Sequence, residues 1–243
     1  MAANVARHVL EARDLVVRYG GVTALQRVSL RIESGEVVGL IGPNGAGKTS
    51  LLNAVSGVAT LSEGSIALDG RAIGGLPVHR IARAGVVRTY QNVRLFRTLS
   101  IGENVRAGAF AARRAIGAAE IDDVLRQTAL GEVDRFAQAG RLPYGAQRRL
   151  EIARALASEP AILLLDEPAA GLNPEESNGL GQLVRSIADR GVGVLLVEHD
   201  MQLVNDVCNR IAVLNFGSLI AHGTPAEIAR DPAVIEAYLG TAR

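Results

Sequence analysis

The chain has 243 residues, 48% of them apolar, which is enough for one large domain or for a core domain that carries a subdomain. Its 26 basic and 25 acidic side chains nearly balance and aromatic residues make up only 3%, which excludes the strongly basic, base-stacking surface of a nucleic-acid-binding protein. No apolar run approaches the roughly 18–20 residues of a membrane-spanning helix, and residues 1–19 mix apolar with charged side chains, so we expect no secretory signal and a cytosolic chain.

The N-terminal third of the sequence is predicted to form strands and turns. Residues 15–17 are a short β-prone run, residues 29–32 alternate polar and apolar side chains, and residues 65–68 precede an Asp-Gly turn. Residues 37–41, in contrast, are apolar throughout, which is typical of a strand buried on both faces of a mainly parallel sheet. A helix is expected to follow over residues 49–56.

The rest of the chain is predicted to be a helical segment followed by alternating strands and helices. Residues 100–156 have helical periodicity and many alanines, which indicates a helical subdomain. Residues 161–165 and 192–197 are apolar strand candidates, and the helix between them is expected to be capped by Asn173. The sequence thus indicates one α/β core with a helical insertion. The single cysteine, Cys208, excludes an internal disulfide, and we expect it to be buried on a helix.

Residues 42–49 carry the most specific motif of the sequence. Gly-Pro-Asn-Gly-Ala-Gly-Lys-Thr fits G-x-x-x-x-G-K-[ST] and stands between an apolar strand and a helix, as a phosphate-binding loop requires. Its glycines allow backbone N–H groups to turn inward around phosphate oxygens, where the helix N-terminus adds a favourable partial charge. Lys48 is expected to reach the β- and γ-phosphates of ATP, and the Thr49 hydroxyl to bind Mg²⁺. The nucleotide-binding residues predicted here are Gly42, Pro43, Asn44, Gly45, Ala46, Gly47, Lys48, Thr49 and Ser50.

Polar groups follow two further apolar strand candidates. Asp166 ends the first of them and is suited to hold Mg²⁺, directly or through water. Glu167 comes next, where a carboxylate can orient a water molecule and accept its proton during attack on the γ-phosphate. His199 follows the second strand and is a candidate sensor of the γ-phosphate. The carboxyl ends of strands in an open α/β sheet are where ligands bind, so these side chains are predicted to share one site.

Residues 141–156, with the sequence RLPYGAQRRLEIARAL, lie shortly before the strand that carries the acidic pair. This segment resembles the signature segment of the ABC ATPases, and its order after the phosphate loop is that of this family alone. The resemblance covers nearly the whole chain. It implies a P-loop NTPase in the form of an ABC nucleotide-binding domain. The domain is then a single one over 1–243, with an α/β core and an antiparallel β subdomain (about 1–90 and 157–243) and an inserted helical subdomain (91–156).

The resemblance also implies roles for residues that carry little signal alone. Tyr19, in the turn Arg-Tyr-Gly-Gly, is similar to the aromatic residue that stacks on adenine. Gln91 resembles the glutamine that touches the Mg²⁺ site and relays to the permease, and His199 resembles the switch histidine. The residues implied to contact the nucleotide of an opposing chain are Gly145, Ala146 and Gln147.

The signature departs from the usual family pattern at two positions. Pro143 replaces a serine and Tyr144 replaces the first glycine, so one hydroxyl and one backbone N–H toward the opposing γ-phosphate are missing. We therefore expect slower hydrolysis at the site that this segment completes. Asn173 stands where many relatives carry aspartate; the two residues cap a helix almost equally well.

These departures are similar to the pattern of one subfamily, the ATP-binding subunits of branched-chain amino acid importers. The segments that carry this resemblance are Leu-Pro-Tyr-Gly at 142–145, Arg-Thr-Tyr-Gln-Asn-Val-Arg-Leu-Phe at 88–96, Glu-His-Asp-Met at 198–201 and Val-Leu-Asn-Phe-Gly at 213–217. The resemblance concerns the motor, because no residue of this chain is expected to contact an amino acid.

The resemblance implies a peripheral subunit at the cytoplasmic face of the inner membrane. Two such domains face head to tail, the second being a similar ATPase chain in a heterodimer, with a homodimer as the alternative. Residues 93–96 and the following helical stretch then dock on integral-membrane permease subunits. A periplasmic or extracellular substrate-binding protein would be an indirect partner, and nucleic acid would not be one. Three alternatives remain open: the ATPase of a lipid or lipopolysaccharide exporter, a soluble ABC ATPase acting on the ribosome or DNA, and a non-catalytic regulatory subunit.

Overall fold

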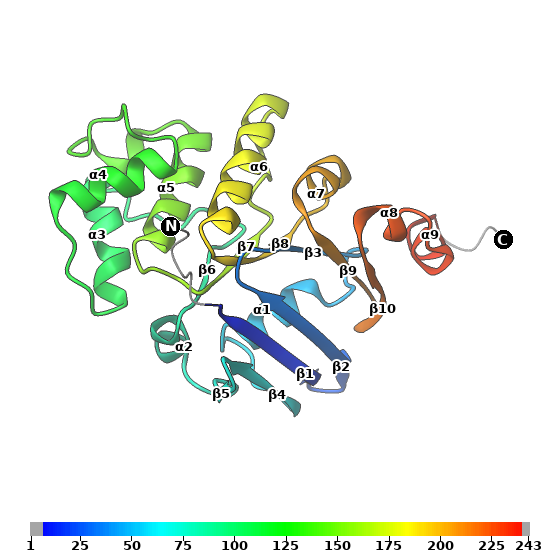
Figure 1. Cartoon of the computed structure of the whole chain (residues 1–243). Helices are drawn as coiled ribbons and strands as arrows, with labels where there is room; N and C mark the ends of the chain where they lie inside the picture. Colours follow the sequence, from blue (N-terminus) through cyan, green and yellow to red (C-terminus); the bar gives the residue numbers. More distant parts are fainter. Residues whose placement is uncertain (1–6, 240–243) are drawn as a thin grey trace.

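The structure is a computed structural model that describes residues 7–239. Its centre is a six-stranded sheet (Figure 1) in the order β10 (Ser218–Gly223), β9 (Arg210–Asn215), β3 (Val37–Ile41), β8 (Gly193–Val197), β7 (Ile162–Asp166) and β6 (Val86–Arg88). All neighbours are parallel except β9 and β10. Every residue of β3, β7 and β8 is buried, which confirms the prediction from their continuous apolar runs.

A second, antiparallel sheet has the order β2 (Val22–Glu33), β1 (Val9–Tyr19), β4 (Glu63–Leu68) and β5 (Arg71–Ala72). Its strands extend well beyond the short runs predicted at 15–17 and 29–32. Several exposed positions of β1 and β2 carry charged side chains, so no continuous apolar run marks the full strands, and shifts in register let the strands continue past irregular stretches.

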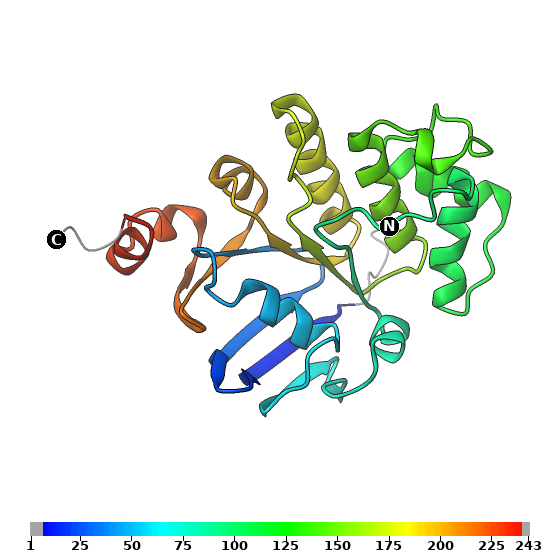
Figure 2. The ribbon, with the colours of Figure 1, turned by 180° about the vertical axis from the view of Figure 1, so that it is seen from behind.

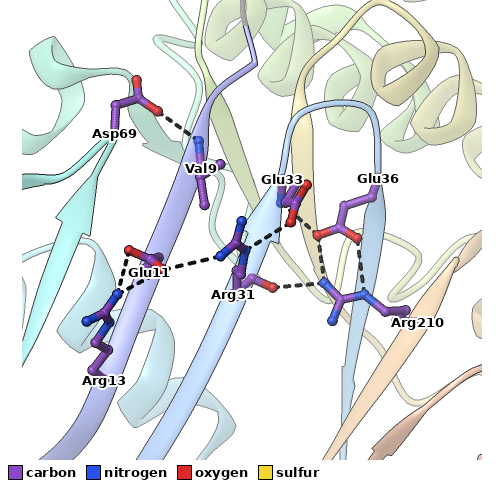
Figure 3. A network of polar contacts seen from close by, with 8 residues as sticks. All are labelled: Val9, Glu11, Arg13, Arg31, Glu33, Glu36, Asp69 and Arg210. Atoms are coloured by element: carbon purple, nitrogen blue, oxygen red, sulfur yellow. Dashed lines mark hydrogen bonds and ion pairs between the residues drawn. The ribbon is translucent and has the colours of Figure 1, made fainter.

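A network of ion pairs and hydrogen bonds lies where this antiparallel sheet meets the parallel one, as Figure 3 shows. Arg31 of β2 contacts Glu11 of β1 and Glu33 of its own strand. Arg210 of β9 donates to both carboxylate oxygens of Glu36, at 2.8 and 3.1 Å, and to the backbone oxygen of Arg31 at 3.1 Å. The Arg31–Glu33 pair is exposed, and pairs of this kind contribute at most about 1 kcal/mol each, whereas the Arg210–Glu36 pair is partly buried.

Helices cover both faces of the central sheet (Figure 2). Helix α1 (Lys48–Val55) lies between the two sheets and shares a hydrophobic core with both, whereas α6 (Pro174–Asp189) and α7 (Met201–Val207) share a core with the opposite face. Asn173 caps α6 and closes a capping box with Glu176, as predicted. Three further helices outside the helical segment are α2 (Val78–Ala84), α8 (Pro225–Ile228) and α9 (Pro232–Leu239).

The helical segment consists of α3 (Ile101–Ala111), α4 (Ala118–Gln127), the 3₁₀ turn η1 (Ala139–Arg141) and α5 (Tyr144–Leu156). These elements have a hydrophobic cluster of their own, and α5 also contributes Ile152 and Ala155 to the core beneath α6. Helix α5 therefore joins the helical segment to the sheet. Among the described residues, no helix is both long and apolar enough to span a bilayer.

The prediction that Cys208 lies on a helix is wrong by one position. The residue is buried as expected, but it is the C-cap of α7 and has extended backbone angles. The chain leaves the helix there because Asn209 already pairs with β3: its N–H donates to the Val37 oxygen, and its side-chain oxygen accepts from the Val37 N–H, both at 2.8 Å.

Candidate functional site

The loop of residues 42–47 connects the central strand β3 to α1. Gly42, Gly45 and Gly47 have positive φ angles of 148°, 81° and 107°, a region that glycine enters without strain. A Cβ atom at Gly42 would lie 2.1 Å from the backbone oxygen of Leu214, whereas a Cβ at Gly45 would meet nothing within 4 Å. The glycine at 42 is thus required by close packing, and the one at 45 leaves an open wall.

Lys48 lies across the loop that it follows. Its Nζ donates to the backbone oxygens of Gly42 at 2.6 Å and Pro43 at 3.0 Å. Burial lowers the pKa of Lys48, and the nearby carboxylates of Glu167 and Asp166 partly oppose this effect. The ammonium group is therefore held at the mouth of the loop, where it is available to a phosphate.

Gln91, Glu167 and His199 meet although they come from three separate parts of the chain. The Gln91 amide Nε2 donates to Oε2 of Glu167 at 2.7 Å, and Nε2 of His199 lies 2.8 Å from its Oε1. Glu167 itself has a φ of 46°, an unusual value for a residue with a side chain and one that is frequent at functional sites. Its N–H donates to Val197 at the end of β8, which fixes this turn.

Two buried charged residues at the site were not anticipated. Arg88, the last residue of β6, forms an ion pair with Asp166, in which Nη2 and Oδ2 are 2.7 Å apart. Glu198 accepts the backbone N–H groups of Ala169 at 2.7 Å and His199 at 3.2 Å, and burial raises the pKa of its carboxyl. Arg88 ends an apolar strand and Glu198 directly follows one. The same pattern predicted the role of Asp166, so it could have indicated Arg88 and Glu198 as well.

The phosphate loop borders a cavity of about 500 Å³. Its lining comprises Val22, Thr23, Ala24, Gln26, residues 44–50, Glu167, His199, Phe216 and Gly217. Gln26 and Phe216 were missed by the sequence analysis. The Gln26 amide donates to the Phe216 oxygen at 2.8 Å across 190 positions, and no local pattern predicts such a contact. Tyr19 is outside this lining; it is half exposed and pairs with Val22 at the cavity edge.

The signature residues lie apart from this cavity, at the start of α5. Pro143 is the N-cap of the helix. Gly145 is buried and packs so closely against α6 that a Cβ there would lie 2.6 Å from the Glu176 carboxylate. The side chain of Gln147 donates to the Leu142 oxygen at 2.7 Å. Within one chain, Gly145, Ala146 and Gln147 therefore do not join the phosphate loop.

The comparisons with known proteins agree with this architecture. The model of the ABC transporter family matches residues 25–170, and that of the branched-chain amino acid ATP-binding cassette transporters matches residues 218–243. The chain is 43% identical to the high-affinity branched-chain amino acid transport ATP-binding protein BraF of Pseudomonas aeruginosa, over 98% of this chain and 100% of that protein. It is 39% identical to the lipopolysaccharide export system ATP-binding protein LptB of Escherichia coli, over 95% and 97% of the two chains.

Solved structures give the same result. The ADP conformation of MJ1267, an ATP-binding cassette of an ABC transporter, superposes with a TM-score of 0.86 at 26% identity, covering 96% of this chain and 99% of that one. A dimeric post-hydrolysis state of the ATP-binding cassette MJ0796, bound to ADP and Pi, superposes with a TM-score of 0.78 at 26% identity, covering 89% and 98%.

Proposed function

The chain belongs to the ABC transporter family, and we propose that it is the ATP-binding, ATP-hydrolysing subunit of an importer of branched-chain amino acids. The hydrolytic part of the proposal rests on the convergence of Gln91, Glu167 and His199 beside the phosphate loop. The substrate class is supported by the family match at residues 218–243 and by the 43% identity to BraF.

The residues at the phosphate loop have the chemistry that ATP and Mg²⁺ require. The open wall at Gly45 leaves room for phosphate oxygens, and Lys48 supplies the positive charge. The hydroxyl of Thr49 and the carboxylate of Asp166 are oxygen ligands of the kind that Mg²⁺ prefers, with Gln91 as a further candidate. When bound, Mg²⁺ neutralises charge on the β- and γ-phosphates. Glu167 orients the attacking water and accepts its proton.

A complete site requires a second chain. The signature residues Gly145, Ala146 and Gln147 lie outside the cavity of their own chain. The Gln147 N–H donates to the Pro143 oxygen at 2.9 Å, whereas the N–H groups of Gly145 and Ala146, in the first turn of α5, have no acceptor within the helix. We propose that they face the nucleotide of an opposing ATPase subunit. The dimeric structure of MJ0796 supports such a pairing. The second subunit is proposed to be a similar, distinct chain, and a homodimer is the alternative.

A groove between the sheet and the helical segment is the proposed docking site for permease subunits. Its volume is about 500 Å³, and Leu95, Phe96 and Gly108 are among its lining residues. Phe96 is 52% exposed, so a large apolar group is available at the surface of this groove. Docking there would place the chain at the cytoplasmic face of the inner membrane, with a substrate-binding protein on the other side as an indirect partner.

Recovery of the native assembly tests the assignment. Tagged chain is purified in a gentle detergent from its native membranes, and co-purifying proteins are identified by mass spectrometry. We expect two polytopic permeases, a second ATPase and an amino-acid-binding protein. Recovery with a lipopolysaccharide-export complex would favour the alternative that the similarity to LptB keeps open, and recovery with ribosomes or DNA would overturn the transporter assignment.

The chemistry is tested on the recovered complex. Glu167→Gln is expected to lower kcat by about 10²–10⁴-fold while ATP binding persists, since only proton acceptance is removed. Arg13→Gln, an exposed change on β1, is the control. Equal turnover in the Glu167→Gln and control complexes would refute the role of Glu167.

The proline of the signature gives a further expectation. Pro143 offers no side-chain acceptor to the free N–H groups of α5, whereas serine at this position caps a helix and adds a hydroxyl. We propose that hydrolysis is slower at the site that this segment completes, and that Pro143→Ser accelerates it. Unchanged turnover in this variant would count against the hypothesis.

A further inference from the structure

Arg88 is a buried arginine that connects three elements of the nucleotide site. It ends the edge strand β6, and its side chain is only 5% exposed. Nη2 donates to Oδ2 of Asp166, at the end of β7, over 2.7 Å. Nη1 donates to the side-chain oxygens of Asn53 at 2.7 Å and Ser56 at 3.3 Å, at the C-terminal end of α1. One planar guanidinium group thus joins β6, β7 and α1.

The two arms of Arg88 reach the two elements that carry the proposed Mg²⁺ ligands. One arm contacts Asp166 directly. The other contacts Asn53, which lies four residues after Thr49 and therefore one turn further along the same face of α1. The fork of a guanidinium group is rigid, so bonds to both partners set the distance and orientation between them, which a flexible ammonium group cannot do.

We infer that Arg88 is a positioning residue that orients the Asp166 carboxylate and braces α1, so that Asp166 and Thr49 are held ready for Mg²⁺. The inference rests on the proposed function, because it assumes that these two residues bind the metal. Groups that hydrogen-bond to metal ligands orient them, and the loss of such a group weakens metal binding even though it touches no metal.

The charge of Arg88 taken alone predicts the opposite change in Mg²⁺ binding when this side chain is replaced, so one measurement distinguishes the two explanations. Arg88 places a positive charge beside Asp166, and like charges repel. If charge alone mattered, removal of the guanidinium group would strengthen Mg²⁺ binding. If positioning matters, the same removal weakens it.

The test measures Mg²⁺-dependent binding of a fluorescent ATP analogue to the full chain, without reference to turnover. Arg88→Met is expected to raise the Mg²⁺ concentration for half-maximal binding by about 10–100-fold, while binding in EDTA stays close to that of the unmodified chain. The Mg²⁺ requirement of Arg88→Lys is expected to lie between those of the unmodified chain and Arg88→Met, because an ammonium group binds one partner at a time. Asn53→Ala keeps both charges and is expected to shift the Mg²⁺ requirement in the same direction as Arg88→Met.

Two further variants separate the inference from its premise. Arg210→Met removes a partly buried arginine from its carboxylate partner at the far side of the sheet, and it is expected to leave the Mg²⁺ requirement unchanged. Asp166→Asn is expected to raise that requirement strongly. If Asp166→Asn has no effect, the proposed metal role of Asp166 is wrong.

Other outcomes bear on Arg88 alone. If Asp166→Asn raises the requirement but Arg88→Met leaves it unchanged or lowers it, the positioning role is overturned. If Arg88→Lys has the same Mg²⁺ requirement as the unmodified chain, the inference that both arms of the guanidinium group are needed is overturned as well. Should circular dichroism show that Arg88→Met does not fold, Arg88→Lys and Asn53→Ala decide the question by the same measurement.

Discussion

Arg148 of α5 offers the sharpest test of how the signature helix is joined to the rest of the site. Its side chain is fully buried. Nη1 donates to the Glu151 carboxylate at 3.0 Å and to the Tyr90 oxygen at 2.8 Å, and Nη2 donates to the Gln91 oxygen at 2.6 Å and to the Tyr144 hydroxyl at 3.1 Å. Arg148→Met keeps much of the apolar stem and removes all four bonds.

The loss of stability in Arg148→Met follows from the Glu151 carboxylate, which remains buried. The Glu151 side chain is 1% exposed, so its carboxylate loses its ion-pair partner while it stays buried. Breaking a buried ion pair in this way costs about 3–5 kcal/mol in the free energy of unfolding. Replacing both partners, in Arg148→Met with Glu151→Leu, removes the stranded charge. The double variant should therefore cost less than the sum of the two single variants, by at least about 0.5–3 kcal/mol.

Urea denaturation followed by far-ultraviolet circular dichroism measures these free energies. Arg149→Met is the matched control, because Arg149 is the next residue of the helix and forms no ion pair within residues 7–239; it should cost less than about 1 kcal/mol. A loss below about 1 kcal/mol in Arg148→Met, or strict additivity in the double variant, would refute the reasoning.

Three further predictions concern packing, burial and pH. A Cβ at Gly108 of α3 would lie 1.8 Å from the Arg154 backbone oxygen of α5, so Gly108→Ala should lower the free energy of unfolding by about 1–3 kcal/mol. Gly21→Ala is the control, because a Cβ at Gly21 would meet nothing within 4 Å. Equal urea midpoints for the two variants would contradict this prediction. Burial raises the pKa of Cys208 to about 12, so iodoacetamide should label this thiol far more slowly in the native chain than in urea. Rapid labelling of the native chain would contradict the burial of Cys208. The capping hydrogen bonds from Ser100 lower the pKa of Glu103 in the folded chain below its ordinary value of 4.5. Its ionised form therefore stabilises the fold above that pH and the contribution is lost as the pH falls, so Glu103→Gln should show a smaller loss of stability on acidification, and parallel curves would rule this out.

Local patterns were enough to predict the strand-to-helix connection at the glycine-rich motif, the buried strands and the cap of α6. In each case the information is contiguous: the loop of residues 42–47 directly joins β3 to α1, and Asn173 meets its capping partner only three residues later. The extents of β1 and β2 were underestimated, because their length depends on pairing with each other along the whole of both strands rather than on any apolar run.

The sequence by itself determined which chemistry this chain carries, since the phosphate loop, the acidic pair and the signature are each written within a few neighbouring residues. Only the tertiary structure decided which of these groups touch. Gln91 reaches Glu167 across 76 positions and Arg88 reaches Asp166 across 78, because β6 lies beside β7 in the sheet. The same packing keeps the signature residues away from the loop of their own chain. Such contacts depend on strand order and on the crossing of distant helices, which no local propensity encodes.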